Sequence, residues 1–126
     1  MNVVELIDTD HTRFSLEIFP PRTRCTDAGM NFQQHLSRIF DTVEVLARYD
    51  PAFISVTYNS ERMTKTTSIP IAAIIKERYG IETVAHLTCI NMRINYLLRT
   101  FEVLDYFDIR NILALRGDIP KGYMHR

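Results

Sequence analysis

The segment NILALRGDIPKG, residues 111–122, changes abruptly from apolar residues to charge, glycine and proline. An apolar run bounded by turn residues is typical of a buried strand, here beginning at Asn111. Arg116 and Asp118 stand where that strand ends. In parallel α/β proteins the loops after the strands converge on one face and carry the chemistry. The segment therefore predicts a ligand site at a strand exit, and a strand followed by a solvated turn is the alternative.

Strands and helices alternate before this segment. Short apolar or alternating runs predict three earlier strands, at residues 14–19, 53–58 and 83–88. Three helices are predicted from apolar residues at helical spacing or from residues that typically begin or end a helix. They lie at residues 31–49, 69–79 and 91–107. The later units are about thirty residues apart, which is the size of a βαβ unit. The pattern predicts an α/β protein with a parallel sheet and right-handed crossovers.

The ends of these elements carry their own signals. Ser68 is the expected N-cap of the helix at 69–79, and Gly80 its C-terminal stop. Pro20 and Pro21 are expected to stop the first strand, because neither can donate a hydrogen bond to a neighbouring strand. The remaining stretches are expected to be a short lead-in and two loops: residues 1–12, 22–29 and 59–68.

Composition excludes several classes of protein. The 126 residues are 46% hydrophobic and 24% charged with a formal net charge of zero, which is ordinary for one small globular domain without a nucleic-acid partner. No apolar run approaches the ~18 residues of a membrane-spanning helix, and the acidic N-terminus is not a signal peptide. Cys25 and Cys89 are far apart and form no metal or redox pair. The sequence predicts a soluble, cytoplasmic protein without a metal site or a membrane partner.

Each predicted strand ends with a polar residue that can lie on a shared face. These residues are Glu17, Thr57 and His86, followed by Arg116 with Asp118. Parallel strands end on one side of a sheet, so the five side chains are expected to meet there. The apolar flanks of Glu17 favour a functional role over an edge carboxylate in water. Alone, Thr57 is an ordinary strand residue and His86 is typical of a structural histidine.

The chain resembles methylenetetrahydrofolate reductase in four segments, one at each predicted strand. In order these are FSLEIFPPRT (14–23), ISVTY (54–58), AHLTC (85–89) and NILALRGD (111–118). The resemblance implies a TIM (β/α)₈ barrel, which typically needs ~250 residues. Residues 1–126 are therefore expected to form the N-terminal part of a single catalytic barrel domain, with roughly its first four strands and three helices.

The resemblance also implies an activity. NADH or NADPH reduces a bound FAD and leaves, and 5,10-methylenetetrahydrofolate then takes its place and receives hydride from the flavin. This ping-pong reaction gives 5-methyltetrahydrofolate for methionine biosynthesis. The chain is expected to be truncated and inactive alone. One alternative is a non-catalytic half-barrel whose exposed edges associate with a second copy, as a homo-oligomer, or with a partner chain. Another is a different barrel enzyme that uses the same strand ends.

The resemblance assigns roles to individual residues. Glu17 corresponds to the general acid that protonates the folate nitrogen when the five-membered ring opens, because a carboxyl held partly out of water can keep a proton at neutral pH. Asp118 corresponds to the aspartate near the flavin and the pterin. Both are thus implied as catalytic and substrate-binding residues. The implied FAD contacts are Thr57, Tyr58, His86, Arg116, Gly117 and Asp118.

Two positions depart from the pattern of the family. Residues 59–64, NSERMT, lack the glycines that commonly follow the second strand, which weakens the expected FAD contacts there. Asp108 stands where the family often has glycine before the fourth strand. A helix C-terminus usually prefers glycine in this place, although Asp can adopt the left-handed conformation at some energetic cost.

Overall fold

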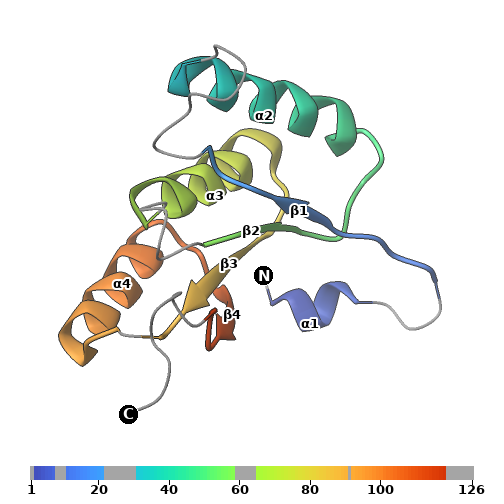
Figure 1. Ribbon diagram of the computed structural model, residues 1–126. Helices are drawn as coiled ribbons and strands as arrows, with labels where there is room; N and C mark the ends of the chain where they lie inside the picture. The colour runs from blue at the N-terminus through green and yellow to red at the C-terminus, as the bar shows by residue number, and fades with distance from the viewer. Residues whose placement is uncertain (1, 8–10, 22–30, 59–64, 91, 119–126) are drawn as a thin grey trace.

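Four parallel strands form one sheet with helices packed against it. The computed structural model describes residues 2–7, 11–21, 31–58, 65–90 and 92–118. The sheet order is β1-β2-β3-β4, and α2, α3 and α4 lie across the sheet from α1 (Figure 1). The elements are α1 (Val3–Leu6), β1 (Leu16–Ile18), α2 (Phe32–Ala47), β2 (Ile54–Val56), α3 (Lys65–Tyr79), β3 (Thr83–Thr88), α4 (Ile94–Tyr106) and β4 (Asn111–Leu115). The predicted α/β class and parallel pairing are confirmed.

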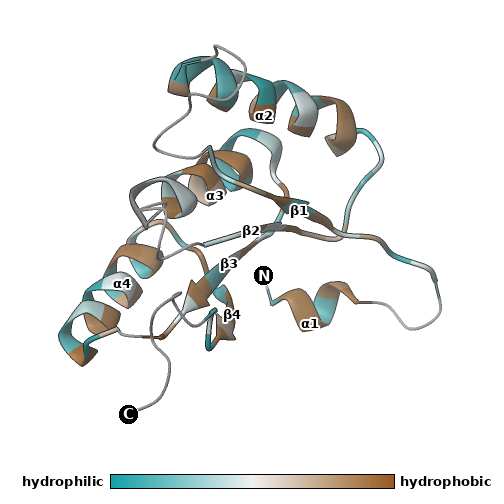
Figure 2. Cartoon of the chain, in the orientation of Figure 1, coloured by the Kyte–Doolittle hydropathy of each residue, from teal (hydrophilic) through white to brown (hydrophobic). Residues whose placement is uncertain are grey.

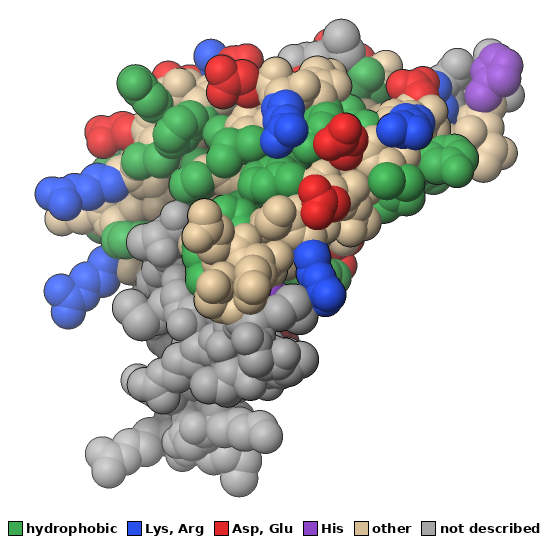
Figure 3. All heavy atoms as spheres, turned by 90° about the horizontal axis from the view of Figure 1, so that it is seen from above, with side chains coloured by type: hydrophobic (Ala, Val, Ile, Leu, Met, Phe, Trp, Pro, Cys, Tyr) green, Lys and Arg blue, Asp and Glu red, His purple; other side chains and the backbone are tan. Residues whose placement is uncertain are grey.

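The hydrophobic core lies between the sheet and its helices. Ile54, Val56 and Ala85 point from the strands into this core, where α3 packs over β2 and β3 (Figure 2). The helices contribute apolar residues at helical spacing, which is why they bind this face: Val43, Ile71, Ala72, Ile75 and Leu104. Seen from above, acidic and basic side chains are interspersed with apolar ones on the side of α2 (Figure 3).

The other face of the sheet carries the polar side chains. The register aligns Glu17 with Ser55 and Ser55 with Val84, so these residues share the face opposite the core. Side chains alternate along a strand, so Thr57, His86 and Thr88 lie on the same face further toward the carboxyl ends. We call this surface, defined by Glu17, Ser55, Thr57, His86 and Thr88, the polar face.

The start of α3 differs from the sequence prediction. The helix begins at Lys65, so residues 65–68 are helical rather than part of a loop, and Ser68 is not an N-cap. Instead, the Ser68 hydroxyl donates a 2.8 Å hydrogen bond to the carbonyl of Thr57 after β2. Pro70 lies inside the helix. The sequence predicts that the Ser68 hydroxyl caps its own helix, but in the structure it makes a tertiary contact with the residue after β2.

The strands and the lead-in also differ in extent. β1 and β2 are three residues each, although hydrogen bonds continue just beyond them, from Ala52 N to Phe14 O and from Thr57 N to Ile18 O. The predicted lead-in contains α1, which begins with a capping box between Asn2 and Glu5. The short helix also binds the sheet, because Val3 N donates to Asn111 Oδ1 at 2.9 Å.

The turn before β4 has the expected left-handed conformation. Asp108 has φ +52°, which is normally costly for a residue with a side chain. Hydrogen bonds from Arg110 and then Lys76 to the Asp108 carboxylate lower the pKa of Asp108 from 3.8 to about 2. These hydrogen bonds therefore stabilise the fold fully above about pH 4, and their stabilising effect is lost as the pH falls toward 2. A glycine could not form these contacts, so they offset the strain of the turn.

Lys76 connects this turn to the beginning of the sheet. Its ammonium group donates to the backbone carbonyl of Asp108 and lies 3.0 Å from the carboxylate of the same residue. It also lies 3.2 Å from Glu82, and Asn111 donates a 3.1 Å hydrogen bond to Glu82. We call Lys76, Glu82, Asp108, Arg110 and Asn111 the strand-start network. It joins α3 to the amino ends of β3 and β4.

Candidate functional site

Glu17 and His86 meet on the polar face. The distance from Glu17 Oε1 to His86 Nε2 is 3.6 Å. The imidazole is only 9% exposed, so packing around β3 fixes its position. These two of the predicted site residues are therefore brought together by the sheet, although they come from β1 and β3.

The Glu17 carboxyl group is not buried in this structure. Its side chain is 48% exposed, which contradicts the expectation of a carboxyl held out of water. β1 is an edge strand of the sheet, and the apolar flanks of Glu17 turn toward the helices instead of covering it. Within the described residues, the ion-pairing partner of this carboxyl is His86.

Gly117 makes a close contact after β4. Its φ is +88°, and a Cβ at this position would lie 3.0 Å from Thr88 Cβ and 3.1 Å from Ile90 Cγ2. The backbone of Arg116 accepts a 2.8 Å hydrogen bond from Ile90 N, which holds the two segments together. In this structure Gly117 therefore packs against residues at and just after the end of β3.

Gly117→Ala is expected to lower the free energy of unfolding by about 2 kcal/mol, because the new methyl group meets the side chains of Thr88 and Ile90 and the left-handed φ is strained. Gly80→Ala is the matched control, since Gly80 also has a positive φ (+66°) but open space around it. The control substitution is expected to lower the free energy of unfolding by about 1 kcal/mol. Urea unfolding followed by circular dichroism measures both losses, and equal losses would show that the close contact is unimportant.

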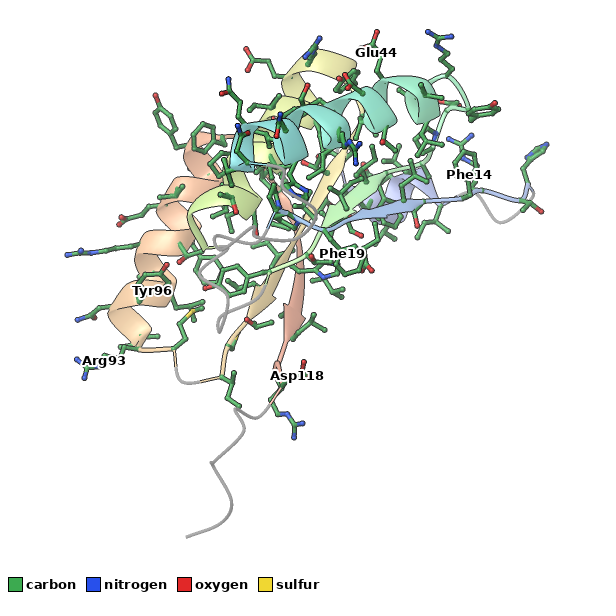
Figure 4. All side chains as sticks on the ribbon, turned by 45° about the horizontal axis from the view of Figure 1, so that its top comes forward. Phe14, Phe19, Glu44, Arg93, Tyr96 and Asp118 are labelled. Atoms are coloured by element: carbon green, nitrogen blue, oxygen red, sulfur yellow. The ribbon has the colours of Figure 1, made fainter. Side chains whose placement is uncertain are left out.

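Arg116 and Asp118 are exposed beyond β4. The Arg116 Nε donates only a long 3.4 Å hydrogen bond to Gly117 O. Figure 4 shows Asp118 just past the end of β4. Among the residues described, no hydrogen bond or ion pair joins Arg116 or Asp118 to Glu17 or His86. The predicted meeting of all five polar side chains is therefore found for Glu17 and His86 alone.

Two buried hydroxyl groups lie at the carboxyl ends of β2 and β3. Tyr58 is 8% and Thr88 is 7% exposed, and the Thr88 hydroxyl has no hydrogen-bond partner among the described residues. The Tyr58 hydroxyl lies next to that of Tyr96 on α4. Burial raises the pKa of Tyr58 above its ordinary value of 10.0, and nearby Tyr96 raises it further. The phenol therefore stays protonated and able to donate a hydrogen bond.

The Thr88 hydroxyl fits the flavin that the resemblance implies. A buried polar group without a partner is costly, and a polar ligand at this edge can supply the missing hydrogen bond. Two other buried polar atoms also lack a hydrogen-bond partner among the described residues. They are Thr83 Oγ1, on the first residue of β3, and His35 Nε2, on α2. The position of Thr88 beside Gly117 is what connects it to the candidate site.

Thr57 and Thr88 show what the sequence did and did not reveal. Thr57 is half-buried, and its backbone contacts β1 and Ser68. Thr88 was not among the predicted site residues, although the alternation from His86 to Thr88 could have placed it on the polar face. The departure at residues 59–64 and the position of Cys25 lie outside the described residues.

The described residues contain neither a candidate metal site nor a candidate membrane-spanning helix. No group of three or more His, Cys, Asp or Glu side chains within these residues is placed to hold a metal ion. No helix in the same part of the chain has the length and apolarity to cross a membrane.

Comparison with known proteins gives a consistent match. Residues 2–125 match the family model described as methylenetetrahydrofolate reductase. The chain is 32% identical over 126 aligned positions to methylenetetrahydrofolate reductase (NADH) 1 of Arabidopsis thaliana, with 97% of this chain and 20% of that protein covered. It is 36% identical over 110 positions to 5,10-methylenetetrahydrofolate reductase of Escherichia coli (strain K12), covering 86% and 33%. The chain thus spans about a fifth of the plant relative and a third of the bacterial one.

Proposed function

Because the chain belongs to the methylenetetrahydrofolate reductase family, we propose that it carries the N-terminal part of a catalytic domain that reduces 5,10-methylenetetrahydrofolate to 5-methyltetrahydrofolate. One observation carries this proposal. The four segments that resemble the family lie on or directly after consecutive parallel strands, which run in the order β1-β2-β3-β4. Glu17, His86 and the Arg116–Asp118 turn are therefore presented by one sheet.

The proposed cofactor is FAD, and the proposed electron donor is NADH or NADPH. When bound, FAD would supply hydride transfer from the nicotinamide to the folate in a ping-pong sequence. Gly117 would form the floor of its site, where a side chain would collide with Thr88 and Ile90. The side chains proposed to hold the cofactor are Thr57, Tyr58, His86, Arg116 and Asp118, to which the unpartnered hydroxyl of Thr88 is added.

Glu17 is proposed to deliver the proton that the folate step requires. Opening the five-membered ring leaves a basic nitrogen, and a carboxyl group positioned beside it can protonate that nitrogen. His86 lies 3.6 Å from this carboxyl and keeps one side of it away from water. Asp118 is proposed to bind the pterin end of the folate and to place a negative charge near the flavin.

Closure of the sheet into a (β/α)₈ barrel is part of the same proposal. β4 is the last strand in the sheet order, and its Ile112, Leu113 and Leu115 side chains are exposed. An apolar strand at an open edge invites pairing with a further strand. Four more strands would bury these side chains and would shield Glu17.

The exposed edge also supports a second candidate function. A half-barrel without catalytic activity could use β4 and the exposed Ile94, Leu98 and Phe101 of α4 to associate with a second copy or a partner chain. Flavin binding distinguishes the two proposals, because an associating fragment has no need of the cofactor.

The first experiment is a visible absorption spectrum of the purified protein, with any released cofactor identified. We expect the spectrum of an oxidised flavin and release of FAD on denaturation. A protein that stays colourless after incubation with FAD, and forms oligomers as its concentration rises, would contradict the catalytic proposal and support the associating half-barrel.

The buried hydroxyls allow a sharper test of the cofactor site. Thr88→Val is expected to weaken FAD binding about fivefold, because one hydrogen bond of about 1 kcal/mol is lost without a change in shape. Thr83→Val is the matched control, since Thr83 is also a buried threonine without a hydroxyl partner among the described residues but begins β3 at the opposite end. Quenching of flavin fluorescence measures both affinities. Equal affinities in the two variants would remove Thr88 from the cofactor site.

A further inference from the structure

The contact between Glu17 and His86 crosses an intervening strand. β2 lies between β1 and β3, and adjacent strands are ~4.8 Å apart, so the two backbones are separated by about 10 Å. The register aligns Glu17 with Val84 through Ser55, which places His86 two residues further along β3. The 3.6 Å distance between Oε1 and Nε2 therefore requires both side chains to extend toward each other over β2.

No other group competes for this contact in the described part of the chain. Ser55 lies beneath it, but its hydroxyl donates to the Leu16 carbonyl at 3.3 Å. Across residues 2–7, 11–21, 31–58, 65–90 and 92–118, no other basic side chain forms an ion pair with Glu17. His86 is thus the partner that the sheet provides for this carboxyl.

The two members of the pair differ in mobility. The His86 side chain is largely buried, whereas the Glu17 side chain is half-exposed and has several free torsions. A long exposed side chain populates many rotamers and loses entropy when it is fixed in one. A fixed imidazole beside it restricts the carboxyl to the rotamers that point over β2 toward the carboxyl ends of the strands.

We propose that His86 is a positioning residue that holds Glu17 in the orientation from which it protonates the folate. This inference rests on the proposed function of Glu17. A neutral imidazole can donate or accept at Nε2 according to its tautomer, so it can hold the carboxyl both before and after proton transfer. The distance of 3.6 Å is slightly longer than a hydrogen bond, as is common for catalytic contacts before substrate binds.

Two substitutions of His86 separate this role from a merely structural one. His86→Gln places an amide nitrogen near the position of Nε2, whereas the shorter His86→Asn reaches only the position of Nδ1. In a complete, flavin-loaded barrel built on this sequence, compared at equal flavin content, we expect His86→Gln to keep the folate half-reaction within about threefold of wild type. We expect His86→Asn to slow it about 10- to 100-fold, because a small displacement of the acid has a large effect.

Flavin reduction by the nicotinamide is expected to change equally in the two variants, because both remove the same imidazole from the proposed flavin site. In the Glu17→Gln background, His86→Asn is expected to cause no further loss in the folate half-reaction, because the two residues act as a unit. Equal loss in His86→Gln and His86→Asn, or the same loss in both backgrounds, would overturn the inference.

Nuclear magnetic resonance provides a readout that is independent of activity. In protein labelled with ¹⁵N-histidine, Glu17→Gln is expected to shift the imidazole resonances of His86, whereas Glu44→Gln on α2 is not. An unchanged His86 resonance in Glu17→Gln would overturn the inference. If Glu17→Gln abolishes the folate step but His86→Asn does not slow it, the proposed function stands and the role of His86 fails. If Glu17→Gln does not slow the folate step, both fail.

Discussion

In a complete barrel built on this sequence, Glu17→Gln is expected to slow the folate half-reaction by about 10²- to 10⁴-fold and to leave flavin reduction by NADH or NADPH near the wild-type rate. The amide has nearly the same size as the carboxyl group but cannot deliver its proton to the folate nitrogen. Hydride transfer from the nicotinamide to the flavin needs no such proton from Glu17. Stopped-flow absorbance of the flavin measures the two half-reactions separately.

The control for this experiment is Glu44→Gln. Glu44 is an exposed carboxylate that points outward from α2 (Figure 4), and its substitution should alter neither half-reaction. Reduction of methylenetetrahydrofolate by Glu17→Gln at the wild-type rate would show that another group supplies the proton. Equal loss in both half-reactions would indicate a damaged flavin site.

Lys76→Met is expected to lower the free energy of unfolding by about 3 kcal/mol. The Lys76 side chain is 19% exposed, and its partner Glu82 is only 9% exposed. Methionine keeps the packing of the alkyl chain but removes the Lys76 ammonium group from beside the largely buried carboxylate of Glu82. The backbone carbonyl of Asp108 loses a donor in the same substitution. Denaturant unfolding followed by circular dichroism measures the change.

Arg110→Met is the matched control for the strand-start network. Arg110 pairs with Asp105 and Asp108, and all three side chains are more than half exposed. Exposed ion pairs contribute little because water screens them, so a much smaller change is expected. If the two variants lost equal stability, the buried carboxylate of Glu82 would not be the cause of the effect.

The sequence predicted best where local pattern and tertiary environment agree. The bounds of β3 were predicted to the residue, because this strand lies inside the sheet with paired neighbours on both sides. The left-handed turn at Asp108 also followed from its position before β4. Its stabilisation by Lys76 could not be predicted, because the two residues are 32 positions apart and meet only in the folded sheet.

The predictions from the sequence that proved wrong have a common physical origin. Ser68 has the side chain of a good N-cap, but a hydroxyl can equally bind a distant carbonyl, and the structure uses it to contact Thr57. In the candidate site, strand alternation was sufficient to place Glu17 and His86 on one face. Their contact over β2 and the exposure of Glu17 depend on side-chain reach and on the edge position of β1, which the sequence pattern does not encode.

The sheet order has a consequence for how the protein is made. Each strand pairs with the one before it in the chain, so each βα unit can join the growing sheet during translation without waiting for distant segments. The hydrogen bond from Val3 to Asn111 is different, because it spans 108 positions. α1 is synthesised before the four strands, yet it can dock on Asn111 only after β4 has left the ribosome.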